Sequence, residues 1–152
     1  MEDKVTVTVK GNLVPDMAGD REAIEIVCAG ERYMRGGSRF VLYEEVMPGF
    51  DENVRNVLRI ADDFVTLRKR GLVVADLAFR EGELCSTHYV TPFGSIMLGM
   101  STRSLRVTDK GDSTDISIVY DAELNYERTG ECRIDIRIEP AGAEEQTAQA
   151  PA

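Results

Sequence analysis

Few residues of this sequence have the type and spacing that catalysis or metal binding requires. The single histidine, His88, excludes a site built from several histidines and weakens any triad with a histidine base. The cysteines Cys28, Cys85 and Cys132 are widely spaced and form neither a C-x-x-C pair nor a disulfide framework. Phosphate-binding loops, dinucleotide-binding glycine patterns and hydrolase or zinc-protease motifs do not occur. We therefore predict no catalytic residue, no metal site and no cofactor.

A short aromatic and acidic run, Tyr43-Glu44-Glu45, is the most informative polar segment. If it lies in a strand, Tyr43 and Glu45 share one face and Glu44 shares the other with Leu42, so one carboxylate has apolar neighbours. A buried carboxylate needs a partner. Lys69 could form an internal ion pair with Glu45 across the barrel, a hypothesis based on the mixed polarity of the two strands. This carboxylate could anchor a ligand inside the barrel. Alternatively, it could lie at a strand end and face solvent, or it could belong to a structural ion pair.

Three further features have a functional and a simpler interpretation. Arg68-Lys69-Arg70 could capture an anion or form a solvated strand end, and His88 could ligate haem or be an ordinary strand histidine. The run from Tyr89 to Gly94 could form a rim that contacts a partner, or only a tight turn after Pro92. The candidate ligand-binding residues are Tyr43, Glu45, Lys69, His88, Tyr89 and Thr91.

Apolar and polar residues alternate along most of the chain, which is typical of strands with one buried face. The pattern is clearest over 4–10, 115–126 and 131–139. Gly49 and Gly71 are among the turn residues that separate the other runs. We expect further strands near Glu22–Ala29, Arg32–Met34, Phe40–Met47, Val54–Ala61, Phe64–Lys69, Leu72–Phe79, Leu84–Val90 and Ser95–Val107.

Two segments of this pattern need interpretation. Glu52–Asp63 could be an amphipathic helix, but Val54, Leu58 and Ile60 also fit one face of a strand, which we favour. In Ser95–Val107 the apolar phase shifts, and a β-bulge near Gly99-Met100-Ser101 would explain the shift and bend the strand. These features predict an all-β fold, an antiparallel meander that closes or nearly closes into a barrel of about eight to ten strands.

Size and charge limit the function classes. The chain has 152 residues, enough for one domain, and a formal net charge of −9, which disfavours binding to nucleic acid or to anionic membranes. No signal peptide or apolar membrane-spanning segment occurs, so we expect a cytoplasmic protein. We expect the barrel to occupy 1–140 and an acidic, alanine-rich tail at 141–152 to be disordered.

Several short motifs occur in an order that resembles the bacterial YwiB-like family of unknown function. Together they extend over roughly Val5 to Glu139. The resemblance implies a calycin-like, lipocalin-like β-barrel in the bacterial cytoplasm, but it supplies no catalytic residues. The motifs are Gly30-x-x-Tyr33, Tyr43-Glu44-Glu45, the basic run before Gly71, Phe79-x-x-Gly82, Tyr89-Val90-Thr91-Pro92-Phe93-Gly94, Leu98-Gly99 and Thr102-x-x-Leu105.

Two functions are consistent with these features. The barrel could bind one small, partly apolar ligand, although bulky residues such as Ile116 and Tyr120 favour a filled interior. Alternatively, the protein could regulate or bind another protein through its acidic surface or rim loops. We do not expect an enzyme, because one would need its titratable groups clustered in a pocket. The chain could be a monomer or a homodimer, and its protein partners are not specified.

Overall fold

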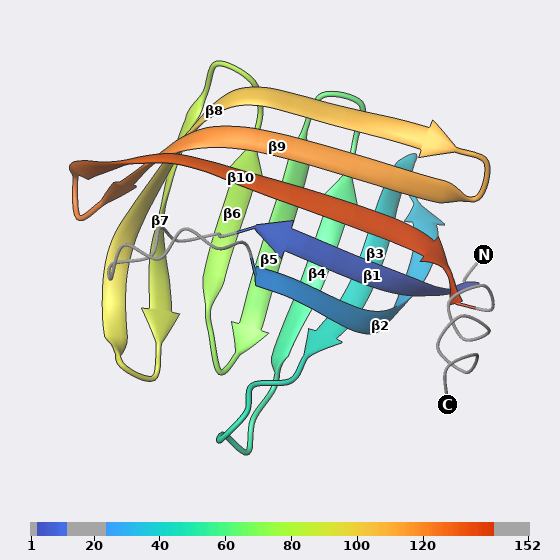
Figure 1. Cartoon of the computed structure of the whole chain (residues 1–152), viewed down its shortest axis with the longest axis horizontal. Helices are drawn as coiled ribbons and strands as arrows, with labels where there is room; N and C mark the ends of the chain where they lie inside the picture. Colours follow the sequence, from blue (N-terminus) through green and yellow to red (C-terminus); the bar gives the residue numbers. More distant parts are fainter. Residues whose placement is uncertain (1–2, 12–23, 142–152) are drawn as a thin grey trace.

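Ten antiparallel strands form one continuous sheet that curls into a nearly closed barrel (Figure 1). The computed structural model describes residues 3–11 and 24–141. The predicted all-β meander is confirmed, and the strand count agrees with the expected eight to ten. The strands are β1 (Asp3–Gly11), β2 (Ile24–Arg35), β3 (Ser38–Glu45), β4 (Val54–Ile60), β5 (Val65–Gly71), β6 (Ala75–Phe79), β7 (Leu84–Thr91), β8 (Gly94–Lys110), β9 (Ser113–Leu124) and β10 (Glu127–Pro140).

The barrel closes because both edges of the sheet find partners. Consecutive strands pair with each other except β6 and β7, and β1 also pairs with β10, from Val5 opposite Pro140 to Gly11 opposite Ile134. The remaining edges, β6 and β7, meet at one bridge in which Val74 and Val90 exchange backbone hydrogen bonds of 3.0 and 2.9 Å. Pairing of this kind leaves few free edges for intermolecular strand addition.

The alternating sequence pattern places one side of each strand in a filled interior. Along β9 every second residue is buried, and β4 shows the same alternation, which confirms the strand predicted over Glu52–Asp63. Aromatic side chains occupy the centre, where the rings of Phe79 and Tyr120 lie 5.5 Å apart. Leu58, Met100 and Ile118 are also fully enclosed. The interior is therefore a packed core for much of its length.

Three expectations about local structure need correction or fall outside the described residues. The register shift in β8 lies between Thr102 and Ser104, not at Gly99-Met100-Ser101, where the pairing is regular. The strands expected at Glu22–Ala29 and Arg32–Met34 are one strand, because Gly30 is paired within it. The expected disordered tail lies, apart from Ala141, outside the described residues.

Gly30 continues β2 because only glycine fits at that position. A Cβ atom there would lie 2.6 Å from the Leu42 carbonyl oxygen and 3.2 Å from the Tyr43 Cβ atom. A real side chain would force β2 away from β3, so the glycine serves close strand packing. The residue is therefore not a strand break.

Two groups of turns border the parts of the barrel described below. The β3–β4 loop, the β5–β6 turn and the β7–β8 turn lie together at the lower edge of Figure 1. The β2–β3 and β8–β9 turns lie at its right-hand side. Within the described residues, no helix is both long and apolar enough to cross a membrane.

Candidate functional site

A cluster of hydrogen-bonded polar side chains lies inside the barrel near the β3–β4 loop. We call Glu45, Asn56 and Lys69 the polar cluster; they come from β3, β4 and β5. Lys69 Nζ donates to Asn56 Oδ1 at 2.9 Å and to Glu45 Oε1 at 3.3 Å, and Asn56 Nδ2 also donates to Glu45 Oε1 at 3.3 Å. The predicted ion pair between Lys69 and Glu45 is confirmed, but it does not span the barrel, because only β4 lies between the two strands in the sheet.

Lys69 is unusual among the described residues because it is the only charged residue in the buried class, with 4% of its surface exposed. Burial lowers the pKa of its ammonium group, while the Glu45 carboxylate acts in the opposite direction. Such a group is stable only with close partners, since an isolated charge in an apolar interior is costly. Its position is fixed by strand pairing, because Lys69 lies opposite Asn56 in the β4–β5 register.

Two tyrosines lie close to the polar cluster. Tyr43 is opposite Asn56 in the register and is 5% exposed, and Tyr89 packs against the core from β7. Burial raises the pKa of the Tyr43 phenol, and it raises the pKa of Tyr89 to about 12. The Glu45 carboxylate raises the pKa of both phenols further, which shows that the two rings lie near this charge.

The structure brings together four of the six candidate ligand-binding residues. Tyr43, Glu45 and Lys69 gather with Tyr89 inside the barrel, whereas His88 lies on the exposed face of β7. Thr91 acts in the β7–β8 turn, where its Oγ1 atom accepts a hydrogen bond from the amide of Phe93 at 3.1 Å. The architectural interpretation of this turn is therefore the better one for Thr91.

Asn56 is the member of the polar cluster that the sequence reasoning missed. It follows Val54 by two residues and precedes Leu58 by two, so it falls on the buried face of β4. A polar side chain in an apolar phase is a signal that could have identified it. The basic run is also divided by alternation: Lys69 points inward, whereas Arg68 and Arg70 form outer ion pairs with Asp76.

Exposed apolar side chains surround the end of the barrel that holds the polar cluster. We call them the apolar rim: Val46, Phe50, Val74, Val90 and Phe93. The rings of Phe50 and Phe93 meet edge to face at 6.1 Å, so the β3–β4 loop contacts the β7–β8 turn. Phe93 is 88% exposed. Several exposed apolar side chains at one end of a fold are typical of binding sites.

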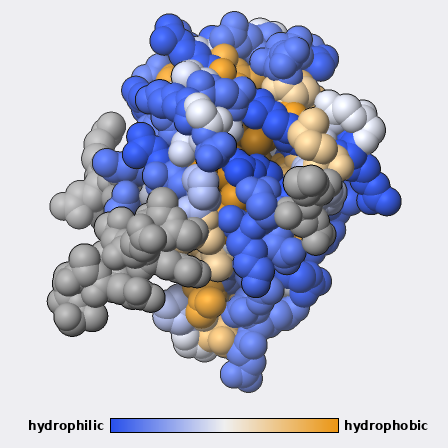
Figure 2. Space-filling view, turned by 90° about the vertical axis from the view of Figure 1, so that its right-hand side faces the viewer, coloured by the Kyte–Doolittle hydropathy of each residue, from blue (hydrophilic) through white to orange (hydrophobic). Residues whose placement is uncertain are grey.

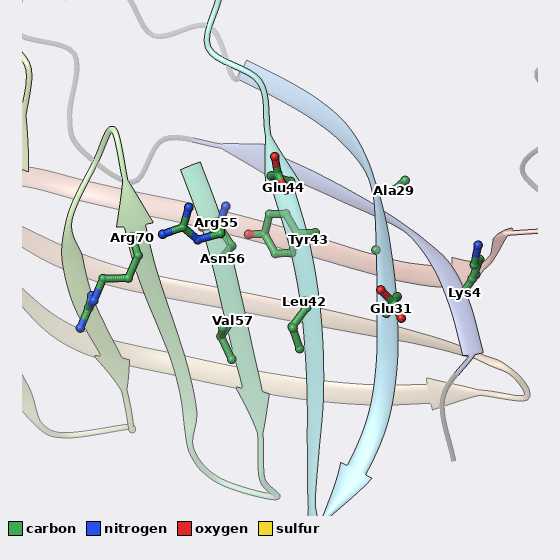
Figure 3. Close-up of a pocket in the computed structure, with 11 residues that line it drawn as sticks. Lys4, Ala29, Glu31, Leu42, Tyr43, Glu44, Arg55, Asn56, Val57 and Arg70 are labelled. Atoms are coloured by element: carbon green, nitrogen blue, oxygen red, sulfur yellow. The ribbon is translucent and has the colours of Figure 1, made fainter. Parts of the chain in front are cut away.

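A groove of about 590 Å³ crosses the outer face of β2 to β5 (Figure 3). The register partners Gly30, Tyr43 and Asn56 line it together with the outward-facing Leu42 and Val57. The groove thus lies on the opposite side of the same strands that carry the polar cluster. Its charged lining residues are Lys4, Glu31, Glu44, Arg55 and Arg70.

The opposite side of the barrel has a different character. We call Asp3, Arg32, Arg39, Asp109 and Thr114 the charged end. These residues surround a hollow of about 340 Å³, whose lining includes buried aliphatic side chains. Figure 2 shows this side covered largely by hydrophilic residues. Within the described part of the chain, no group of three or more histidine, cysteine or acidic side chains is arranged to hold a metal ion.

These features define a nearly closed, ten-stranded antiparallel barrel with a packed interior and a buried polar cluster at one end. The chain belongs to the family described as Domain of unknown function (DUF1934), which matches residues 4–136. Its structure is similar to the crystal structure of the ywiB protein from Bacillus subtilis, with a TM-score of 0.77 and 24% sequence identity. The match covers 91% of this chain and 92% of that chain, and it confirms the predicted family and barrel. No curated protein matches the sequence.

Proposed function

We propose that this barrel binds one small, partly apolar molecule at the apolar rim, with the polar part of the ligand facing Glu45. The observation that carries the proposal is the coincidence of two features at one end of the barrel. Glu45 and Tyr89 of the interior directly precede Val46 and Val90 of the rim in sequence. Convergent polar groups beneath an apolar surface are typical of small-molecule sites.

Stability alone gives little reason for a buried ion pair at this position. Replacing such a pair with well-packed apolar residues is often neutral or stabilising. The neighbouring interior positions of β4 and β5 are apolar, as at Leu58 and Leu67. A requirement to recognise a polar group would explain why Glu45, Asn56 and Lys69 interrupt this core.

The ligand in this proposal lies across the mouth of the barrel. Large side chains such as Tyr120 and Phe79 fill the centre, which disfavours a molecule enclosed deep inside. At the mouth, Glu45 retains 16% exposure of its side chain, so a bound group could reach its carboxylate. The proposal therefore places the ligand between Glu45 and the two aromatic rings of the apolar rim.

The outer groove and the hollow at the charged end are less suitable, because many of their polar groups already bind each other. In the outer groove, Arg70 binds Asp76 and two backbone carbonyl groups, and Glu44 accepts a hydrogen bond from Asn53. At the charged end, Arg32 and Arg39 each pair with an aspartate. A ligand there would have to displace these contacts.

A second function, docking of a protein partner on the apolar rim, is favoured by the exposure of Phe93. Exposed aromatic residues at a turn are frequent anchors of protein interfaces. Both functions use the apolar rim, but a small molecule and a protein partner differ greatly in mass. A measurement of the bound mass therefore distinguishes them.

Native mass spectrometry of the protein purified from its own cells tests the proposal. We expect a retained small molecule that is lost from the Phe93→Ser variant. Tyr126→Ser is the matched control, because Tyr126 is an aromatic residue that is also largely exposed in a turn, the β9–β10 turn. A bound mass of protein size that is lost with Phe93 would support docking instead. Retention of the small molecule by Phe93→Ser would contradict a site at the rim.

A further inference from the structure

The arrangement of the polar cluster specifies which chemical group a ligand meets first. Of the ion pair, Lys69 is the deeper member, with 5% side-chain exposure, against 16% for Glu45. Asn56, at 1% exposure, is also behind the carboxylate. A molecule that enters from the apolar rim therefore meets a hydrogen-bond acceptor before it can meet the ammonium group.

Both donors of the cluster bind the same oxygen of Glu45. Lys69 Nζ and Asn56 Nδ2 each approach Oε1 at 3.3 Å, and Lys69 is held further by Asn56 Oδ1. A carboxylate has two oxygens and about four acceptor sites, so Glu45 retains capacity for another donor. An anionic ligand would instead be repelled by this carboxylate and could reach Lys69 only by displacing it.

The surroundings also favour a positive charge. Phe50 and Phe93 present aromatic rings at the rim, and ring faces attract organic cations. Asp51 and Glu52 add negative charge to the loop that borders this mouth. The chain as a whole carries a formal charge of −9, which attracts cations from solution.

From this geometry we infer that the ligand carries an ammonium group on an apolar or aromatic body, with the ammonium donating to Glu45 and the body covering Phe50 and Phe93. This inference rests on the proposed function and narrows it to one ligand class, the organic amines. No covalent step is involved.

Three probes with the same ring and different polar groups test the inference: phenethylammonium, phenethyl alcohol and phenylacetate. We would titrate each at neutral pH and follow the backbone amide signals of Tyr89, Val90 and Phe93 by NMR. We expect phenethylammonium to bind at least about tenfold more tightly than phenylacetate, a difference of about 1.4 kcal/mol. The alcohol should lie between them, because it donates a hydrogen bond but carries no charge.

Two neighbouring carboxylates supply matched variants. Glu45→Gln keeps a side-chain acceptor for Lys69 and Asn56 and removes the charge, so it should abolish the preference for the ammonium probe. Glu44→Gln changes the adjacent residue on the outer face and should leave the preference intact. Both variants should show wild-type amide spectra before titration, which separates loss of binding from loss of fold.

The outcomes distinguish the inference from the proposed function. If the alcohol or phenylacetate binds as tightly as the ammonium probe, the ligand class is wrong and binding at the rim stands. If Glu44→Gln abolishes the preference and Glu45→Gln does not, the assignment to the polar cluster is wrong. If no probe gives saturable shifts at the rim up to about 10 mM, a range that covers weak fragment binding, the proposed function itself is contradicted.

Discussion

The two ends of the barrel each place a cation beside a carboxylate, but in opposite surroundings. At the charged end, Arg39 and Asp109 lie 2.7 Å apart, and their side chains are 27% and 56% exposed. At the apolar rim, Lys69 and Glu45 lie 3.3 Å apart and are far less exposed. The shorter contact is thus the more solvated one. The distance between the charged atoms does not show how much stability is lost when one partner is removed. Water can replace a lost partner in the exposed pair, but it reaches the buried pair much less easily.

The same contrast gives the two ends opposite responses to pH. Near the apolar rim, burial raises the pKa of Tyr43 and Tyr89, so this region is sensitive to alkali. At the charged end, hydrogen bonds from Arg39 and Thr114 lower the pKa of Asp109, and a bond from Arg32 lowers that of Asp3. The charged end is therefore sensitive to acid. Each prediction below changes one end and leaves the other as its reference.

Alkali is expected to produce the largest effect, complete unfolding. Burial raises the pKa of Tyr89 to about 12 and that of Tyr43 and Tyr120 above its ordinary value. Their contribution to stability is fully present below about pH 10, the unfolded pKa, and that of Tyr89 is lost as the pH rises through about 12. Folding lowers the pKa of Lys69, so this residue makes the folded state more stable as the pH rises. We expect the three tyrosines together to outweigh this single group.

Circular dichroism and tyrosinate absorbance, followed together against pH, test this prediction. We expect the absorbance of the buried phenols to rise in step with the loss of β signal. Phenols that ionise fully while the barrel stays folded would show that the interior near the rim is open to hydroxide. The guanidinium pairs of the charged end should have no part in this transition, because arginine stays protonated throughout.

The part of this picture that was available from the sequence follows from alternation. Period-two spacing predicts that Glu45 shares a face with Tyr43, and the mixed polarity of the two strands suggested the ion pair with Lys69. Alternation equally places Asn56 between Val54 and Leu58, but that signal was not used. The sequence suggested a rim over Tyr89–Gly94, but it could not predict the contact of Phe93 with Phe50, because closure of the barrel and no local pattern brings the two rings together.

The same limit applies to His88 and to the bulge. His88 and Tyr89 were both candidate ligand-binding residues, although adjacent strand residues point to opposite faces. The apolar phase shift in β8 predicted a bulge correctly but not its position between Thr102 and Ser104. Side-chain phase shows that an extra residue exists, whereas the hydrogen-bond partners on β9 decide where it lies.

Lys69→Ala should be the most damaging single substitution among the ion pairs compared here. It leaves the Glu45 carboxylate and the Asn56 amide without their shared partner in a largely buried site. We expect the free energy of unfolding to fall by about 3 kcal/mol, as found when one partner of a buried pair is removed. Urea denaturation at neutral pH measures it. A loss below about 1 kcal/mol, the range of exposed pairs, would mean that water enters the polar cluster freely.

Replacing both charges should be less harmful than replacing one. In the double variant Lys69→Met and Glu45→Leu, no uncompensated charge remains, but Asn56 keeps only its 3.4 Å hydrogen bond to the Val54 carbonyl. We expect a loss of about 1 to 2 kcal/mol relative to the wild type, smaller than that of Lys69→Ala. The double variant should nevertheless lose ligand binding at the apolar rim, so stability and binding should separate. A double variant as unstable as Lys69→Ala would mean that the cluster is needed for folding, which would remove the stability argument for a ligand.

Arg39→Ala should give the smallest effect and thereby complete the comparison. Asp109 keeps its hydrogen bond from Thr114 and remains half exposed, so water can replace the lost guanidinium. We expect a loss of about 0.5 kcal/mol at neutral pH, and less at high salt, because exposed pairs are screened. Without Arg39, the lowered pKa of Asp109 should return toward its ordinary value. The variant should therefore lose less unfolding free energy than the wild type as the pH falls below about 4. A loss as large as that of Lys69→Ala would mean that exposure does not distinguish the two ends. The lost stability would then come from the aliphatic part of Arg39, which lines the hollow with Val41 and Ile60.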